Sequence, residues 1–168
     1  MGKTTTAVNL AASLAATKRK VLLIDLDPQG NATMASGIDK YEVPATCYEL
    51  LVEEQSVSEV VQEETTGLYD LIAANADVTA AEIKLMEVYA REQRLKTALA
   101  PVKNYYDFII IDCPPSLNML TVNAMTAADS VLVPMQCEYY ALEGLTALMD
   151  TISKLTSVVN SDLHIEGI

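Results

Sequence analysis

Two unbroken apolar runs, each ending in an aspartate, constrain the fold of this chain more than any other feature. Residues 21–24 lead to Asp25, and residues 108–111 lead to Asp112. Strands that are apolar on both faces are typical of a parallel sheet covered by helices on both sides. The segments between these runs have helical patterns, so strands and helices alternate. We therefore predict an α/β fold with a parallel sheet flanked by helices and right-handed crossovers.

The 168 residues suit a single domain over 1–168, with 51% hydrophobic and 20% charged residues. Helices are expected at residues 4–17, 47–51, 57–61, 78–103 with a break near Tyr89, 117–128 and 143–160. Further strands are expected at 68–73, 130–134 and 163–168, and a loop at Pro28, Gly30 and Asn31.

Composition excludes several classes of protein. No run approaches the ~18 consecutive apolar residues of a membrane helix, and the amino terminus has no signal-peptide pattern, so we expect a cytoplasmic protein without a membrane partner. The three cysteines form no C-x-x-C pair, which argues against a zinc site or a disulfide framework. A net charge of −12 argues against a broad nucleic-acid surface on this chain.

Residues Gly2, Lys3, Thr4 and Thr5 open the first helix with the second half of the phosphate-binding pattern G-x-x-x-x-G-K-[ST]. In that pattern the amides of the helix N-terminus point at phosphates, the lysine neutralises their charge and the first threonine binds Mg²⁺. An ordinary helix start with a threonine cap is the alternative interpretation. The first glycine and its strand are not in the sequence, so we expect a sheet whose first strand is missing.

Aspartates follow both apolar runs, at Asp25 and Asp27 and at Asp112. Any one of them could simply cap the next turn. Together with the Gly-Lys-Thr-Thr helix start they favour a nucleotide site, because ligands bind at the carboxyl ends of parallel strands. Asp112 has the form of a Walker-B residue, which supports Mg²⁺ through water.

Four motifs in order resemble the ParA/Soj partition ATPases. They are Gly-Lys-Thr-Thr-Thr-Ala-Val-Asn-Leu-Ala (2–11), Val-Leu-Leu-Ile-Asp-Leu-Asp-Pro-Gln-Gly-Asn-Ala-Thr (21–33), Tyr-Asp-Phe-Ile-Ile-Ile-Asp-Cys-Pro-Pro-Ser (106–116) and Val-Pro-Met-Gln-Cys-Glu-Tyr-Tyr-Ala-Leu-Glu-Gly-Leu (133–145). The resemblance spans essentially the whole chain. MinD-type and nitrogenase iron-protein-type ATPases share the P-loop and Asp112 pattern, but the Asp-Pro-Gln-Gly-Asn-Ala-Thr block is similar to the partition branch.

The resemblance implies a deviant-Walker ATPase domain that binds ATP and Mg²⁺, dimerises with ATP and hydrolyses it slowly. Its first strand and its C-terminal part would lie outside the chain. In this family the C-terminal part carries nonspecific DNA binding, and a ParB-like protein is a partner. A homodimer associated with the nucleoid is thus expected.

The resemblance also implies residue roles. Gly2, Lys3, Thr4 and Thr5 would contact phosphate, with Thr4 also on the metal, and Lys3 would serve catalysis. Asp112 would support the metal. Asp27 would position the attacking water, with Asp25 as its switch-loop partner in cofactor binding.

The strand order of the family that the chain resembles implies that the missing strand lies between the strands that end at Asp25 and Asp112, so nucleotide binding by these 168 residues should be weak. Two alternatives remain open at this point. One is a MinD-like membrane-cycling ATPase, and the other is a nucleotide-free fragment that acts as an interaction module.

Overall fold

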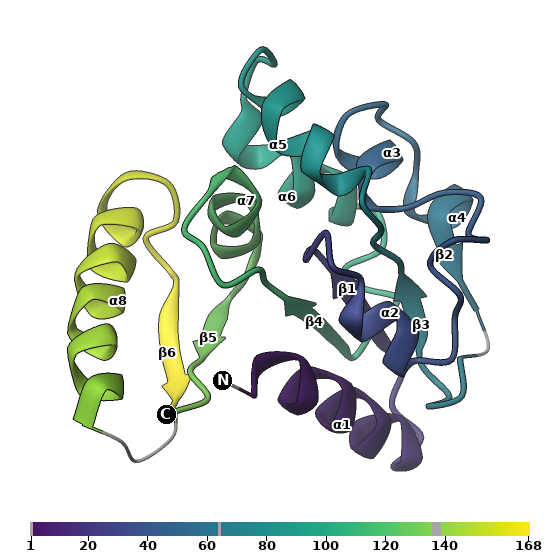
Figure 1. Cartoon of the computed structure of the whole chain (residues 1–168), viewed down its shortest axis with the longest axis horizontal. Helices are drawn as coiled ribbons and strands as arrows, with labels where there is room; N and C mark the ends of the chain where they lie inside the picture. The colour runs from purple at the N-terminus through teal and green to yellow at the C-terminus, as the bar shows by residue number, and fades with distance from the viewer. Residues whose placement is uncertain (1, 64, 136–138) are drawn as a thin grey trace.

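The structure, a computed structural model, describes residues 2–63, 65–135 and 139–168 and has helices on both sides of a mainly parallel sheet (Figure 1). Cys137 lies outside the described residues. The helices are α1 (Lys3–Ala16), α2 (Asn31–Ala35), α3 (Cys47–Leu51), α4 (Val57–Val60), α5 (Val78–Leu85), the 3₁₀ turn η1 (Arg91–Gln93), α6 (Arg94–Leu99), α7 (Met119–Ala127) and α8 (Tyr139–Val158). The strands are β1 (Val21–Asp25), β2 (Val61–Gln62), β3 (Asp70–Ile72), β4 (Phe108–Asp112), β5 (Ser130–Leu132) and β6 (His164–Gly167).

The strands form two sheets. Four of them have the order β2-β3-β1-β4, in which β1 is parallel to both β3 and β4 and the short β2 is antiparallel to β3. Strands β5 and β6 form a separate parallel pair. Figure 1 shows this pair and α8 to one side of the four-stranded sheet. The predicted α/β fold with a mainly parallel sheet is confirmed, and the antiparallel β2 is an addition to it.

Strand β1 is buried on both faces, which explains its unbroken apolar sequence. Val21 and Leu23 belong to a cluster with Ala11 and Ala15 of α1. Leu22 and Ile24 belong to a larger cluster on the other face, with side chains from α3 to α7. Helix α1 therefore covers one face of the sheet, and α3 to α7 cover the other.

Strands β1 and β4 pair directly, so the expectation that a further strand separates Asp25 from Asp112 is wrong. Their register runs from Val21 opposite Phe108 to Asp25 opposite Asp112. The two apolar runs have equal lengths and stop at the same level, which lets every residue of one strand pair with the other. Within the described residues the break in the sheet lies instead between β4 and β5, and Phe108 of β4 is 44% exposed.

Two stretches show how local chemistry sets the element bounds. The predicted break near Tyr89 is confirmed, because α5 ends at Leu85 and Ala90 takes a left-handed φ of 52° before η1. Helix α2 lies where the sequence predicts only a loop. Gly30, with a φ of 62°, turns the chain so that the helix can start at once at Asn31.

None of the described helices has the length and apolarity needed to cross a bilayer.

We predict that Leu23→Ala lowers the free energy of unfolding by about 3 kcal/mol, because it empties a fully buried position in the central strand. Urea unfolding checks this, with Ile83→Ala as the matched control. Ile83 is 67% exposed on α5, so its truncation should change stability by less than about 0.5 kcal/mol. Equal losses in both variants would contradict the assignment of β1 as the core strand.

Candidate nucleotide site

The predicted site residues meet at the carboxyl ends of β1 and β4. Asp25 and Asp112 are the last residues of these strands and stand opposite each other in the register. Lys3, Thr4 and Asp27 lie close enough to the Asp112 carboxyl group to shift its pKa. The start of α1, the loop after β1 and the end of β4 therefore converge on one place.

The N-terminus of α1 presents amides that no side chain of the described residues caps. Gly2 takes a left-handed φ of 94°, and a side chain built at this position would meet nothing within 4 Å. The first helical hydrogen bond runs from the Thr6 amide to the Gly2 carbonyl oxygen, at 2.9 Å. The amides of Lys3, Thr4 and Thr5 precede that bond, so the helix start favours an anion through its free N–H groups and dipole. The Thr5 side chain is exposed at this end.

Asp112 is a buried carboxylate with an unpaired oxygen. It is only 2% exposed, and its Oδ2 has no hydrogen-bond partner among the described residues. Burial raises the pKa of this carboxyl group, the neighbouring Thr4 hydroxyl and Lys3 ammonium lower it, and the Asp27 charge raises it. An orphaned anionic oxygen of this kind is costly without a cation or a donor. The site therefore fits a bound cation.

A divalent cation here would need ligands beyond the side chains. No group of three or more His, Cys, Asp or Glu residues that could hold a metal occurs within residues 2–63, 65–135 and 139–168. One carboxylate and one hydroxyl, from Asp112 and Thr4, are a typical protein contribution to Mg²⁺, which keeps waters and takes phosphate oxygens for the rest. The residues present thus fit a magnesium ion that arrives with a nucleotide.

Asp25 differs from Asp112 because the protein uses both of its oxygens. Its Oδ1 accepts a hydrogen bond from the Asp27 amide at 3.1 Å. Its Oδ2 accepts from the Thr33 amide at 2.9 Å and from the Thr33 hydroxyl at 2.8 Å. Burial is the largest influence and raises the pKa of Asp25 to about 6, although these hydrogen bonds lower it. As placed, Asp25 anchors the loop after β1, and its contact with a cofactor stays a prediction.

Asp27 lies in a tight turn that leads away from this anchor. Its Oδ1 accepts a hydrogen bond from the Gln29 amide at 2.9 Å, and its carbonyl oxygen accepts one from Gly30 at 2.8 Å. The carboxyl group is near enough to Asp112 to influence its titration. The turn therefore holds an acidic group beside the place where a phosphate chain would meet a cation.

Sequence reasoning missed two buried residues that support the site, Thr33 and Cys47. The Cys47 thiol donates to the Asp25 carbonyl oxygen at 2.8 Å, and burial raises the pKa of this thiol well above its usual value. Thr33 closes the quoted Asp-Pro-Gln-Gly-Asn-Ala-Thr block. Neither residue carries a signal in the sequence, because each of these bonds joins residues of different elements.

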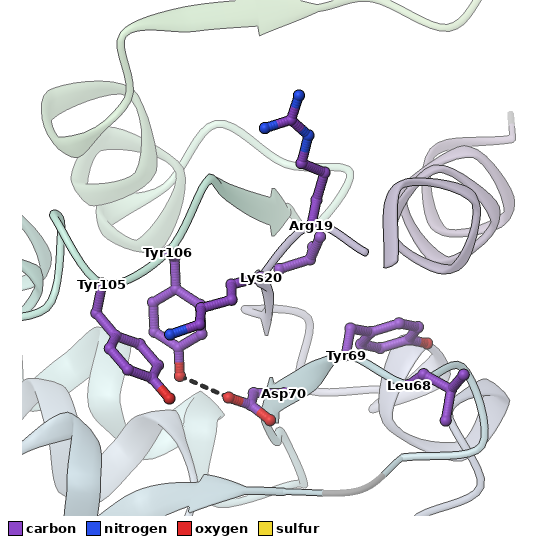
Figure 2. A pocket seen from close by; sticks show the side chains of 8 residues that line it. Arg19, Lys20, Leu68, Tyr69, Asp70, Tyr105 and Tyr106 are labelled. Atoms are coloured by element: carbon purple, nitrogen blue, oxygen red, sulfur yellow. Dashed lines mark hydrogen bonds between the residues drawn. The ribbon is translucent and has the colours of Figure 1, made fainter. Parts of the chain in front are cut away.

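A pocket lies at the opposite end of the sheet from the candidate nucleotide site (Figure 2). This pocket of about 230 Å³ is lined by residues at the amino ends of β1 and β3 and before β4, including Lys20, Asp70 and Tyr105. Tyr106 donates to Asp70 at 2.8 Å, and the Lys20 ammonium lies 4.0 Å from the centre of the Tyr105 ring. Its groups contact one another at the amino ends of the strands, so it is separate from the candidate nucleotide site.

Titration of Asp25 should weaken the fold as pH rises. Its pKa of about 6 lies above the ordinary 3.8, so its contribution to stability is fully present below pH 3.8 and is lost as pH rises through 6. We expect the unfolding free energy of the wild type, minus that of Asp25→Asn, to fall by about 2–3 kcal/mol between pH 4 and 7 without divalent cations. Urea unfolding at each pH measures the difference, and a flat difference would contradict the raised pKa.

Comparison with known proteins finds a matching family and similar proteins along the whole chain. A family model described as an AAA domain matches residues 1–165. The whole chain is 51% identical to the sporulation initiation inhibitor protein Soj of Bacillus subtilis and 50% identical to the chromosome partitioning protein ParA of Myxococcus xanthus. It covers 66% of the first protein and 59% of the second, so it spans less than two thirds of these curated relatives.

A solved structure with the same fold is that of cobyrinic acid a,c-diamide synthase from Mycobacterium smegmatis, crystallised with an ATP analogue and magnesium. The TM-score is 0.93 at 41% sequence identity, over 98% of this chain and 67% of that one. The candidate site thus lies in a fold that holds a nucleotide and magnesium in a similar protein.

Proposed function

The chain belongs to the AAA-domain family with the Soj and ParA partitioning proteins, and we propose that it is the ATP- and Mg²⁺-binding part of a partition ATPase. One observation carries the proposal. A buried carboxylate oxygen of Asp112 has no hydrogen-bond partner among residues 2–63, 65–135 and 139–168, and it lies beside the lysine and threonine that open a helix without a side-chain cap from those residues. Anion-binding amides and a cation-seeking carboxylate at one sheet edge suit a metal–phosphate ligand.

In this proposal the start of α1 binds the triphosphate. The amides of residues 3–5 and the Lys3 ammonium hold phosphate oxygens and offset their charge. Gly2 leaves room for the phosphates, since nothing lies near its α-carbon on the side-chain side. Thr4 and Asp112 hold Mg²⁺, which when bound neutralises charge on the phosphate oxygens.

Hydrolysis is assigned to the loop after β1. Asp27 orients the attacking water, and the Asp25 carboxylate holds the Asp27 amide through a hydrogen bond. Positioning is the main contribution that a protein makes to phosphoryl transfer, so a rigid turn suits this role. The chemistry is slow in the proposed cycle, and ATP binding drives formation of the homodimer.

Partition requires contacts beyond these residues. We assign nonspecific DNA binding to a C-terminal part, because a net charge of −12 makes this chain a poor surface for phosphate backbones. A ParB-like partner stimulates turnover in this scheme, which operates in the cytoplasm on the nucleoid. The Soj and ParA likeness favours this cycle over a membrane-based one.

ATP binding should depend on a strand beside β4. We expect the 168-residue chain to bind ATP·Mg²⁺ weakly, because β4 pairs with β1 alone among the described strands and the Asp112 side of the site is left unsupported. A protein with a strand and glycine loop of the Soj type fused before residue 1, called the extended version below, should bind ATP·Mg²⁺ with micromolar affinity. Isothermal titration of both proteins checks this, and equal affinities would show that the retained residues suffice.

Within the extended version, Lys3→Ala should weaken ATP binding at least ~100-fold, since it removes a cation from the phosphates. Lys84→Ala is the matched control, because Lys84 is an exposed lysine on α5 and, unlike Lys3, does not influence the titration of Asp112. Similar losses in both variants would remove Lys3 from the site.

Asp27→Ala should separate binding from turnover. We expect ATP affinity within about threefold of the wild type and kcat lower by about 100-fold, because the residue orients water rather than holding phosphate. Phosphate release and titration with ATP measure the two quantities. Wild-type turnover in this variant would assign water positioning to another group.

A further inference from the structure

Thr33 lies at the centre of a buried hydrogen-bond chain behind the candidate site. Its hydroxyl donates to Asp25 Oδ2 at 2.8 Å and accepts from the Ala74 amide at 2.9 Å. Its own amide donates to the same Asp25 oxygen at 2.9 Å. Thr33, Asp25 and Ala74 are all 0% exposed. The hydroxyl therefore joins the end of β1 to the segment after β3 where water does not reach.

The Asp25 carboxylate holds both ends of the loop that contains Asp27. Oδ2 binds Thr33 at the far end of the loop, and Oδ1 accepts from the Asp27 amide at its beginning. Cys47 ties the same strand end to the segment after β3 by a second route, since its thiol donates to the Asp25 carbonyl oxygen and its amide donates to Ala73 at 2.9 Å. The turn at Asp27 thus starts from a carboxylate whose orientation depends on Thr33.

We propose that Thr33 is a positioning residue for ATP hydrolysis, which acts through Asp25 on the orientation of Asp27. The inference rests on the proposed ATPase function and on the water-positioning role of Asp27. Thr33 touches neither phosphate nor metal in this scheme. It fixes the rotation of the Asp25 carboxylate, and Oδ1 of that carboxylate then sets the Asp27 amide.

The hydroxyl, not the bulk of the side chain, carries this role. Valine has nearly the shape of threonine but can neither donate to Asp25 nor accept from Ala74. Thr33→Val would leave the Ala74 N–H buried without an acceptor and Asp25 Oδ2 with one donor fewer. Serine keeps both bonds, so Thr33→Ser tests the hydroxyl by rescue.

Kinetics of the extended version test the proposal. We expect Thr33→Val to lower kcat about 10-fold with KM for ATP within about twofold, and Thr33→Ser to stay near wild type. Thr126→Val is the matched control, because Thr126 is also buried, at 1% exposed, and its hydroxyl donates to Val122 within α7. In the Asp27→Ala background, Thr33→Val should reduce kcat no further. A further 10-fold loss there, or failure of serine to rescue, would overturn the proposal.

Amide exchange on the 168-residue chain gives a readout that needs no ATPase activity. Thr33→Val should speed exchange of the Asp27, Gln29 and Gly30 amides about 10-fold while leaving the β1 amides unchanged, and Thr33→Ser should not. Unchanged exchange at these three amides would overturn the proposal. If Thr33→Val speeds exchange at these amides but the extended version hydrolyses no ATP, the result would support the positioning role and count against the proposed ATPase function.

Discussion

The direct pairing of β1 with β4 is the constraint on which the site depends. Five register pairs end with Asp25 opposite Asp112, so the two aspartates that terminate the apolar runs stand on neighbouring strands at one level. A shift of one residue would turn every side chain of the strand to the other face. The alternating packing of Val21 and Leu23 toward α1, and of Leu22 and Ile24 toward α3 to α7, opposes such a shift. Core packing thereby fixes the geometry of the acidic groups.

The two paired aspartates differ in their hydrogen bonding because their surroundings differ. Asp25 is satisfied by three donors from the loop that it holds, whereas one buried oxygen of Asp112 has no partner in the part of the chain that the structure describes. Burial raises the pKa of both carboxyl groups, yet only Asp112 has Lys3 and Thr4 beside it. One aspartate is thus part of the scaffold of the loop, and the other is available to a cation. This difference comes from neighbouring elements and not from the strand-end pattern that both share.

Much of the fold was predictable because burial on both faces leaves a continuous apolar run, as in residues 21–24, and a helix leaves spaced apolar positions. The convergence of Lys3, Thr4, Asp27 and Asp112 was also predictable, because carboxyl ends of parallel strands share one edge. Strand order was not, since local sequence does not say which apolar run pairs with which. Thr33 and Cys47 were missed for a related reason, as their partners lie on other elements.

The break between β4 and β5 links the sheet to the site. Parallel sheets are normally covered by helices on both faces, yet the isoleucines of β4, which lies at the edge of the four-stranded sheet, are only half-buried. Asp112 ends this strand, and the uncapped start of α1 approaches the same point. An additional parallel strand beside β4 would cover the isoleucines and run toward Gly2, bringing further amides to the phosphates. Within the described residues, the edge of β4 that faces away from β1 and the start of α1 therefore meet at the same aspartate, Asp112.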